Sequence, residues 1–272
     1  MAFRGGAVPP PPGRRGRGGV LPLVRGPALP LLPPGRDARV RRARGRLRAV
    51  TDLGAPEHLG ALLGIALATA VLVVAARRPN PDWWLKTLAV VLVVDEVSWW
   101  AYLLLGGVPG SLLALSLPLQ LCDTAILITA AALWTRRPLL VEVTYFWGLA
   151  GTIQALLTPD LPQHFPSYPY WQYYIAHGGV VASALVLVVG LQIHPRPWAV
   201  LKVAALTIAY TALVGAIDLV TGANYMYLRA KPPTATLLDV LGPWPWYIGT
   251  AALIGFALLA LLDAPFRLVR RR

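Results

Sequence analysis

The feature that most constrains this chain is a series of apolar runs, each about 20 residues long and nearly free of charge. A helix of that length crosses the roughly 30 Å hydrocarbon core of a bilayer. Only 14% of the residues are charged, against about 25% in ordinary soluble domains. The pattern predicts an all-α, polytopic membrane protein.

Seven apolar spans can be counted, separated by segments rich in Gly and Pro and bordered by Trp and Tyr. Aromatic residues gather at membrane interfaces, and Gly and Pro mark the turns between helices. The spans are 59–76, 84–105, 112–134, 138–157, 171–192, 198–220 and 243–263. We therefore expect residues 50–272 to form a bundle of seven transmembrane helices.

Residues 1–49 differ from the rest because they hold twelve arginines and one acid, Asp37, among many Pro and Gly residues. Such a segment buries too little apolar surface to offset its ordering entropy, so we predict that it is disordered. The alternative is an arm that binds the phosphates of nucleic acid or lipid. The unstructured tail is the simpler interpretation, and we expect no nucleic-acid partner.

Positive charge predicts the orientation, because cytoplasmic loops of membrane proteins are enriched in Lys and Arg. The loops after the first, third and fifth spans and the C-terminal tail hold eleven such residues, whereas the opposite loops hold two, Arg229 and Lys231. We therefore expect a cell-membrane protein with its C-terminus in the cytoplasm and its N-terminus outside. Twelve exported arginines would contradict this rule, so either the tail overrides part of the topology or translation starts near Val50, and we favour the later start as a hypothesis.

Five of the predicted helices carry polar groups in the outer half of the membrane. These groups are Asp95, Cys122 with Asp123, Gln154, His177 and Asp218. Ionisable groups at that depth normally face a bundle interior or a wet cavity. The outer segments 158–170 and 222–233 are expected to cap such a cavity.

The sole cysteine, Cys122, is the candidate nucleophile, and His177 lies at a comparable depth from the same face. A thiol in apolar surroundings needs a base to become a thiolate, and histidine is the usual base. An acid can fix the tautomer of that histidine, and Asp95 is the first choice, ahead of Asp123 and Asp218. The alternative is that the thiol and the imidazole are only packing and hydrogen-bonding groups.

The expected substrate is a membrane phospholipid or lysolipid. The expected binding groups are Asp123, Gln154, Asp218, Asn224, Tyr225, Arg229 and Lys231. Arg229 and Lys231 suit a phosphate headgroup, although cations near an interface also occur without any ligand.

Other chemistries have no signal in the sequence. The chain lacks a Gly-rich phosphate loop, a GxSxG elbow and a His-x4-Asp motif. Its four histidines do not have the spacing of metal ligands. We therefore expect no metal and no cofactor.

Several tracts resemble the bacterial YwaF-like integral membrane proteins, which are grouped with the transmembrane protein 164 acyltransferases. The tracts are Leu-Pro-Leu-Gln-Leu-Cys at 117–122, Tyr-Phe-Trp-Gly at 145–148, Asn-Tyr-Met-Tyr-Leu at 224–228 and Gly-Pro-Trp-Pro-Trp-Tyr at 242–247. The resemblance covers about residues 55–265. It implies an enzyme acting on lipid acyl chains, with Cys122 as nucleophile and His177 as the intramembrane histidine. Many bacterial members have His where this chain has Gln120.

Three functions follow from these observations. The first is a lipid acyltransferase or lipid thiol-hydrolase that uses Cys122 and His177. The second is a seven-helix transporter or receptor, in which the same polar groups form a binding cavity or a proton path. The third is an assembly scaffold, for which neither set of residues would matter.

Overall fold

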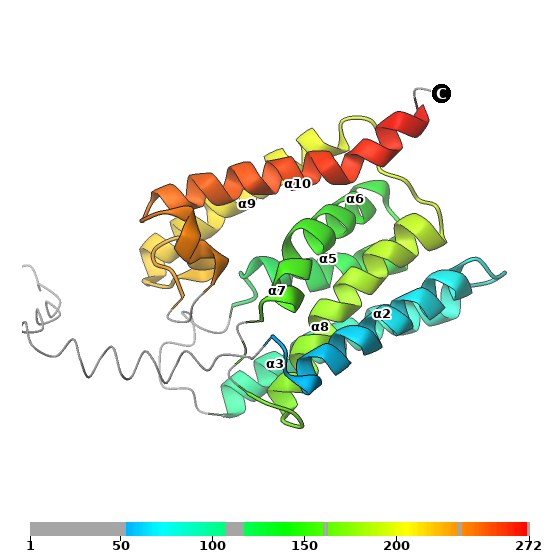
Figure 1. Cartoon of the computed structure of the whole chain (residues 1–272), viewed down its shortest axis with the longest axis horizontal. Coiled ribbons are helices and arrows are strands. Elements are labelled where there is room, and N and C mark those ends of the chain that lie inside the picture. Colours follow the sequence, from blue (N-terminus) through cyan, green and yellow to red (C-terminus); the bar gives the residue numbers. More distant parts are fainter. Residues whose placement is uncertain (1–52, 107–116, 160, 162, 233–235, 271–272) are drawn as a thin grey trace, which may run out of the picture. The chain divides into compact units, whose positions relative to one another are not determined.

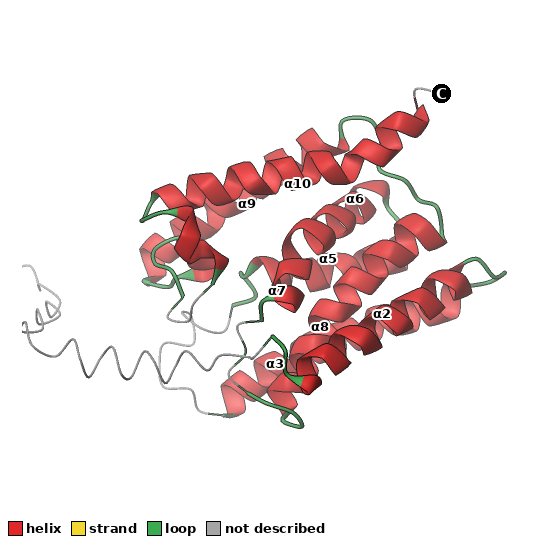
Figure 2. Ribbon diagram, viewed as in Figure 1, coloured by secondary structure: helices red, strands yellow, loops and turns green. Residues whose placement is uncertain are grey.

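The computed structural model describes residues 53–106, 117–159, 161, 163–232 and 236–270, and every regular element in these ranges is helical (Figures 1 and 2). The prediction of an all-α chain is therefore confirmed. The expectation for residues 1–49 lies outside the described part of the chain. The elements are α2 (Pro56–Ala76), α3 (Asp82–Leu105), α5 (Leu121–Thr135), α6 (Pro138–Trp147), η1 (Gly148–Thr152), α7 (Ile153–Leu157), α8 (Tyr168–Leu185), η2 (Val186–Gly190), α9 (Ala199–Thr221), η3 (Tyr225–Tyr227), η4 (Leu237–Leu241) and α10 (Trp246–Arg270).

Six helical stretches of the described residues are long and apolar enough to cross a membrane. They correspond to six of the seven predicted spans. Two of them contain a π-helical turn: α6 continues through η1 into α7, and α8 continues into η2. The prediction of seven full-length spans is not confirmed, because the third span is shorter than expected.

The predicted span 112–134 is wrong at residues 117–120, since α5 begins only at Leu121 and has 15 residues. Residues 117–120 are not helical, and Gln120 is extended. Pro118 explains this, because proline has no N–H for a helix and disfavours helical geometry in the residue before it. Residues 112–116 lie outside the described ranges.

The non-helical segment before α5 is held by side chains from distant parts of the chain. Tyr210 of α9 donates to the carbonyl of Leu119 (3.0 Å), and Tyr225 of η3 accepts from the N–H of Leu117 (3.1 Å). Backbone groups within a membrane need partners inside the protein, because lipid supplies none. The hydroxyls of these two tyrosines allow a helix to begin inside the bundle.

The α6–α7 and α8–η2 stretches form the centre of the packing, and the other long helices surround them. In the most apolar windows, 56% of residues in Pro138–Leu157 and 67% in Tyr168–Gly190 are buried, against 11–17% in α2, α3, α9 and α10. Gly148 permits close approach within this centre, since a Cβ there would lie 3.3 Å from Val180 Cγ1. Exposed apolar side chains on the surrounding helices are typical of lipid-facing surfaces.

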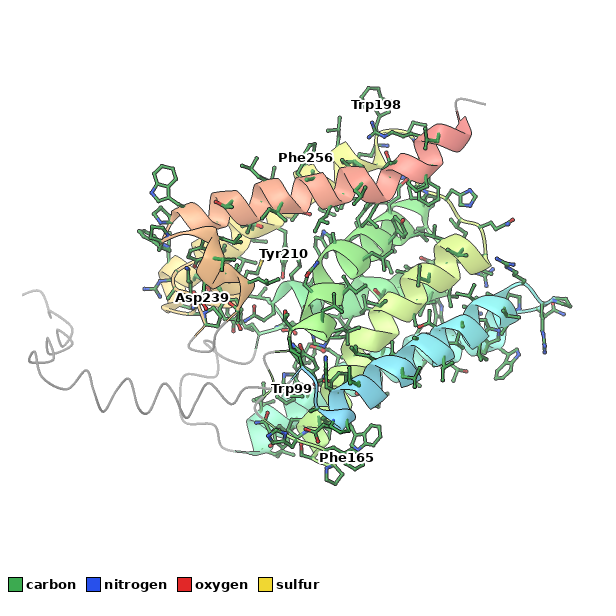
Figure 3. All side chains as sticks on the ribbon, viewed as in Figure 1. Trp99, Phe165, Trp198, Tyr210, Asp239 and Phe256 are labelled. Carbon is green, nitrogen blue, oxygen red and sulfur yellow. The ribbon has the colours of Figure 1, made fainter. Side chains whose placement is uncertain are left out.

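The α9–α10 pair shows how the helices divide their faces. Figure 3 places Trp198 and Phe256 on the outer side of this pair, whereas Tyr210 points towards α5. Trp198 and Phe256 are 71% and 47% exposed, while Tyr210 bonds the residues around the start of α5. One face of the pair therefore points outwards, and the other bonds to the segment around the start of α5.

Three ion pairs lie at one end of the helices, which we call the ion-pair end. They join Arg136 to Asp82, Arg196 to Glu142 and Arg267 to Asp263. Figure 1 shows the end of α5, the start of α6 and the end of α10 on the same side. These arginines belong to the set that is predicted to face the cytoplasm. That orientation stays a prediction, because the helices alone do not distinguish the two membrane faces.

Candidate functional site

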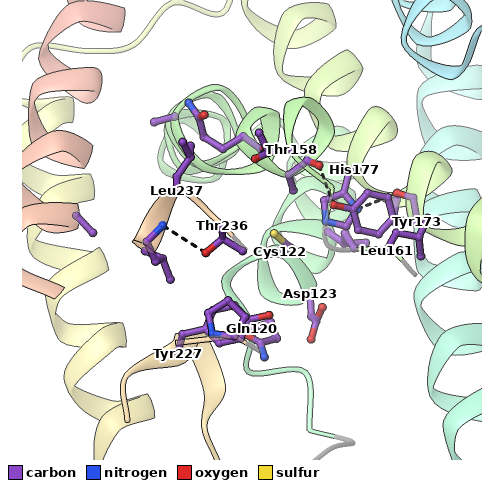
Figure 4. A pocket seen from close by; sticks show the side chains of 18 of the residues that line it. Gln120, Cys122, Asp123, Thr158, Leu161, Tyr173, His177, Tyr227, Thr236 and Leu237 are labelled. Carbon is purple, nitrogen blue, oxygen red and sulfur yellow. Dashed lines mark hydrogen bonds between the residues drawn. The ribbon is translucent and has the colours of Figure 1, made fainter. Parts of the chain in front are cut away.

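A cavity of about 820 Å³ lies towards the other end of the helices, which we call the cavity end. Its wall combines α3, α5, α7 and α8 on one side with η4 and α10 on the other. Cys122, Asp123, Gln154 and His177, which sequence analysis singled out, all line it. Figure 4 shows the side chains of Cys122, Asp123 and His177 around the same space.

Cys122 lies in the first turn of α5, because that helix begins at Leu121. The first N–H groups of a helix have no acceptor within the helix, and they carry a partial positive charge. A cysteine in such a turn is better placed to become a thiolate than one in the middle of a span. Its thiol also lies within hydrogen-bonding reach of Thr152, the last residue of η1. π-helical turns of this kind are frequent at functional sites.

His177 is fixed by its own helix rather than by an acid. Its Nδ1 lies 2.8 Å from the carbonyl oxygen of Tyr173, one helical turn earlier, and the two rings stack 4.1 Å apart. A carbonyl only accepts, so Nδ1 must donate, and the neutral imidazole keeps its lone pair on Nε2. Tyr173 is held in turn by a bond from its hydroxyl to the carbonyl of Ala155 (2.8 Å).

The structure does not show Asp95 bonded to Nδ1 of His177, because the Tyr173 carbonyl occupies that nitrogen. Asp95 instead accepts a hydrogen bond from Gln172 Nε2 (3.3 Å). It is not among the residues that line the cavity, whereas its neighbour Glu96 is. Successive residues point in directions about 100° apart around a helix, and on α3 it is Glu96 rather than Asp95 that faces the cavity.

Gln120 joins the start of α5 to the loop after α9. Its Oε1 accepts from the backbone N–H of Met226 (2.8 Å), and it also lines the cavity. Met226 and Tyr227 have positive φ angles of 53° and 56°, which non-glycine residues adopt rarely. Tyr227 lines the cavity as well. The bond from Gln120 thus helps to hold a strained backbone turn against the site.

Both segments that were expected to cap the cavity contribute to its wall. Thr158, Leu161 and Gln163 come from segment 158–170, and Tyr227 and Pro232 come from segment 222–233. The polar side chains predicted to bind substrate in the second segment, and Asp218 of α9 just before it, are placed differently. Asp218, Asn224, Tyr225, Arg229 and Lys231 are not among the lining residues.

Contacts within the loop explain this placement. Asp218 Oδ1 accepts from the N–H of Tyr225 (2.9 Å), and Asn224 Oδ1 accepts from the N–H of Arg229 (2.9 Å). The Arg229 guanidinium donates to the carbonyl of Ala223 (3.1 Å). Burial raises the pKa of the Tyr225 phenol, so this side chain stays neutral. These groups build the loop, and their predicted contact with substrate has no support from the geometry.

Lys231 is also engaged. Its Nζ lies 3.5 Å from the carbonyl oxygen of Asp239 and 5.4 Å from the ring centre of Tyr247. The latter is a cation–π contact. The phosphate-binding role predicted for Arg229 and Lys231 therefore finds neither side chain on the cavity wall.

A family model, that of the TMEM164 family, matches residues 53–263. The chain belongs to the TMEM164 family. The match includes all the helices that carry the cavity, and it identifies the chain as a multi-pass membrane protein. No curated protein and no solved structure matches the chain.

The site of this TMEM164-family protein combines a thiol, a neutral imidazole, amide side chains and carboxylates in one cavity. Within the described ranges, no group of three or more His, Cys, Asp and Glu side chains is arranged to hold a metal ion. A thiol and an imidazole in one cavity suit nucleophilic chemistry. Sequence analysis missed Tyr173 and Thr152, and only the four-residue spacing between Tyr173 and His177 could have indicated a contact.

Proposed function

We propose that this protein is a membrane-embedded enzyme that transfers an acyl chain between lipids, or hydrolyses it, with Cys122 as nucleophile and His177 as base. One observation carries the proposal: Cys122, in the first turn of α5, and His177, with its proton fixed on Nδ1, line the same cavity. The apolar wall from α10, including Ile254 and Leu258, suits a lipid acyl chain.

The reaction has two halves. In the first, Nε2 of His177 takes the proton of the Cys122 thiol, and the sulfur attacks the carbonyl carbon of a lipid ester. The ester C–O bond breaks, and the imidazolium returns the proton to the departing alkoxide, which leaves as a lysolipid. The acyl chain is now a thioester on Cys122. Backbone N–H groups in the first turn of α5 are suited to stabilise the oxyanion of the intermediate.

In the second half, His177 removes a proton from the hydroxyl of a lysolipid or from water. The resulting oxygen nucleophile attacks the thioester carbon, the C–S bond breaks, and the sulfur takes the proton back from the imidazolium. A lysolipid acceptor gives a transferase, and water gives a hydrolase.

The test is labelling of the purified protein with an acyl-type activity probe, read by intact mass. Because Cys122 is the only cysteine of the chain, a thioester adduct reports on that residue alone. We expect an adduct on the wild type, none on Cys122→Ser and strongly reduced labelling of His177→Ala. His194→Ala is the matched control, because His194 is exposed and is not among the cavity-lining residues. Full labelling of His177→Ala would remove the histidine from the mechanism.

A transporter or receptor is the second candidate, favoured by the carboxylates that line the cavity without an arginine partner, Glu96 and Asp123. Such groups in membrane helices mark ion and proton paths in many transporters. The two candidates differ in their response to Cys122→Ala, which abolishes acyl transfer but leaves transport or ligand binding intact. Lipid profiling and proton flux in vesicles containing this variant distinguish them.

A further inference from the structure

Gln120, the residue immediately before α5, has all but one of its polar groups bonded within the described part of the chain. Its backbone carbonyl accepts the first helical bond, from the N–H of Thr124 (3.2 Å), and its backbone N–H donates to the carboxylate of Asp123. Its side-chain Oε1 accepts from the N–H of Met226 (2.8 Å). The amide nitrogen, Nε2, is the remaining group, and it donates to none of the described residues.

The orientation of this side-chain amide follows from its partner. A backbone N–H only donates, so the oxygen of the Gln120 amide faces Met226, and Nε2 lies on the other side of the amide group. Nε2 is not among the fully buried side-chain atoms that lack a partner, so it is accessible from the cavity that Gln120 lines. The cavity wall therefore carries an N–H donor that no described residue occupies.

This donor lies close in the chain to the candidate nucleophile. Gln120 precedes Cys122 by two residues, and both line the same cavity (Figure 4). When a thiolate attacks an ester, the electrons of the carbonyl double bond move to the oxygen, which becomes negatively charged. An N–H donor that is already held in place stabilises this oxyanion, and removing one such donor slows a reaction by about 100-fold or more.

We propose that Gln120 is a catalytic residue whose Nε2 donates a hydrogen bond to the oxyanion that forms when Cys122 attacks an acyl ester. The two ends of the amide then have different tasks. Oε1 anchors the side chain to the turn at Met226, and Nε2 is thereby held ready for the substrate oxygen. This role rests on the proposed function. A purely structural Gln120 would need only the oxygen of its amide, and this difference makes the two roles separable.

The experiment compares two reactions of Cys122 in the full-length protein in detergent, each followed by intact mass over time. p-Nitrophenyl decanoate acylates the thiol through an oxyanion, whereas iodoacetamide alkylates it by direct displacement without one. Gln120→Glu keeps an acceptor for the N–H of Met226 but replaces Nε2 by a carboxylate oxygen. We expect acylation to slow by about 100-fold, while alkylation stays near the wild-type rate. The loss should be larger at alkaline than at neutral pH, because a protonated glutamic acid donates as the amide does.

Gln192→Glu is the matched control, because it makes the same change at an exposed residue that does not line the cavity, and both rates should stay unchanged. Gln120→Met removes both ends of the amide and should also slow acylation more than alkylation, so it decides the question if Gln120→Glu fails to fold. Equal slowing of the two reactions, or no slowing, would overturn the oxyanion role and leave the chemistry of Cys122 standing. A wild-type protein that is alkylated but never acylated would overturn this role and the proposed function together.

Discussion

The two ends of the helices treat buried carboxylates in opposite ways. At the ion-pair end, the Glu142 side chain is 2% exposed, and both of its oxygens accept from the Arg196 guanidinium, at 2.8 and 2.9 Å. At the cavity end, Glu96 is buried to the same extent, and its Oε1 has no hydrogen bond from the described residues. The buried glutamate at the ion-pair end therefore has a charged partner, whereas Oε1 of the buried glutamate at the cavity end has no partner among the described residues.

This difference suggests two purposes for buried carboxylates: the paired one stabilises the fold, and the unpaired one serves binding or chemistry. A paired buried charge holds elements together, and its loss is felt as unfolding. An unpaired one lowers stability and is retained where binding or chemistry requires it. Arg196 also donates its backbone N–H to Glu142 (3.0 Å), so the loop after η2 is fixed to α6. Among the described residues, no such partner bonds Oε1 of Glu96.

The largest effect is expected from the chemistry of the cavity end. His177→Ala should lower lipid acyl turnover by about 100-fold or more, because general-base catalysis contributes that much. Its unfolding temperature should stay near that of the wild type, since the lost bond lies within one helix. Lipid mass spectrometry and thermal unfolding in detergent measure both. Normal turnover in this variant would show that His177 takes no part in the chemistry of the cavity end.

The next largest effect belongs to the ion-pair end. Arg196→Ala removes the guanidinium from the buried Glu142 and leaves it only the backbone N–H of residue 196 as a donor, and we expect it to lower the free energy of unfolding by about 3 kcal/mol. The turnover of the molecules that remain folded should be unchanged, because Arg196 is not a cavity-lining residue. Denaturant unfolding and lipid turnover per folded molecule are the measurements. A turnover loss larger than the loss of folded protein would contradict the separation of the two ends.

The sharpest contrast is a carboxylate removed at the cavity end. Glu96→Gln should raise the free energy of unfolding by about 1 kcal/mol, because it removes a buried charge that lacks a full set of partners. The sign is opposite to that expected for Arg196→Ala. Denaturant unfolding measures the sign, and clear destabilisation would indicate that Glu96 is structural.

The smallest effect is expected from Asp82→Asn. Its ion pair with Arg136 is exposed, with 60% of the Asp82 side chain accessible, and water and salt screen such pairs, so they contribute little to stability. Thermal unfolding should differ little from that of the wild type. A loss of stability as large as that of Arg196→Ala would show that burial does not determine how much an ion pair stabilises this protein.

The sequence predicted the positions of six long helices, because length and hydropathy are local properties. It also indicated that Cys122 and His177 lie at similar depth, and both line the same cavity. It did not predict the start of α5, although Pro118 carried that signal, because hydropathy continues through the break.

The bond from Gln120 to Met226 could not be predicted, since it joins residues 106 positions apart and depends on how α9 packs. The same holds for the contacts of Tyr210 and Tyr225 with residues 117–119. The partner of His177 Nδ1 also differs from the one suggested by the sequence, because a backbone carbonyl one turn away, that of Tyr173, bonds this nitrogen in place of Asp95. Depth along a helix is readable from a sequence, whereas partners depend on rotation and packing.

The shortness of α5 has a consequence for kinetics. Its 15 residues rise about 22 Å, less than the roughly 30 Å of a hydrocarbon core, so a helix that ends at the ion-pair surface begins below the opposite one. A reaction at Cys122 then draws its substrates from the bilayer rather than from water. Its velocity should follow the mole fraction of lipid substrate in the membrane, and adding inert lipid should slow it at constant total substrate.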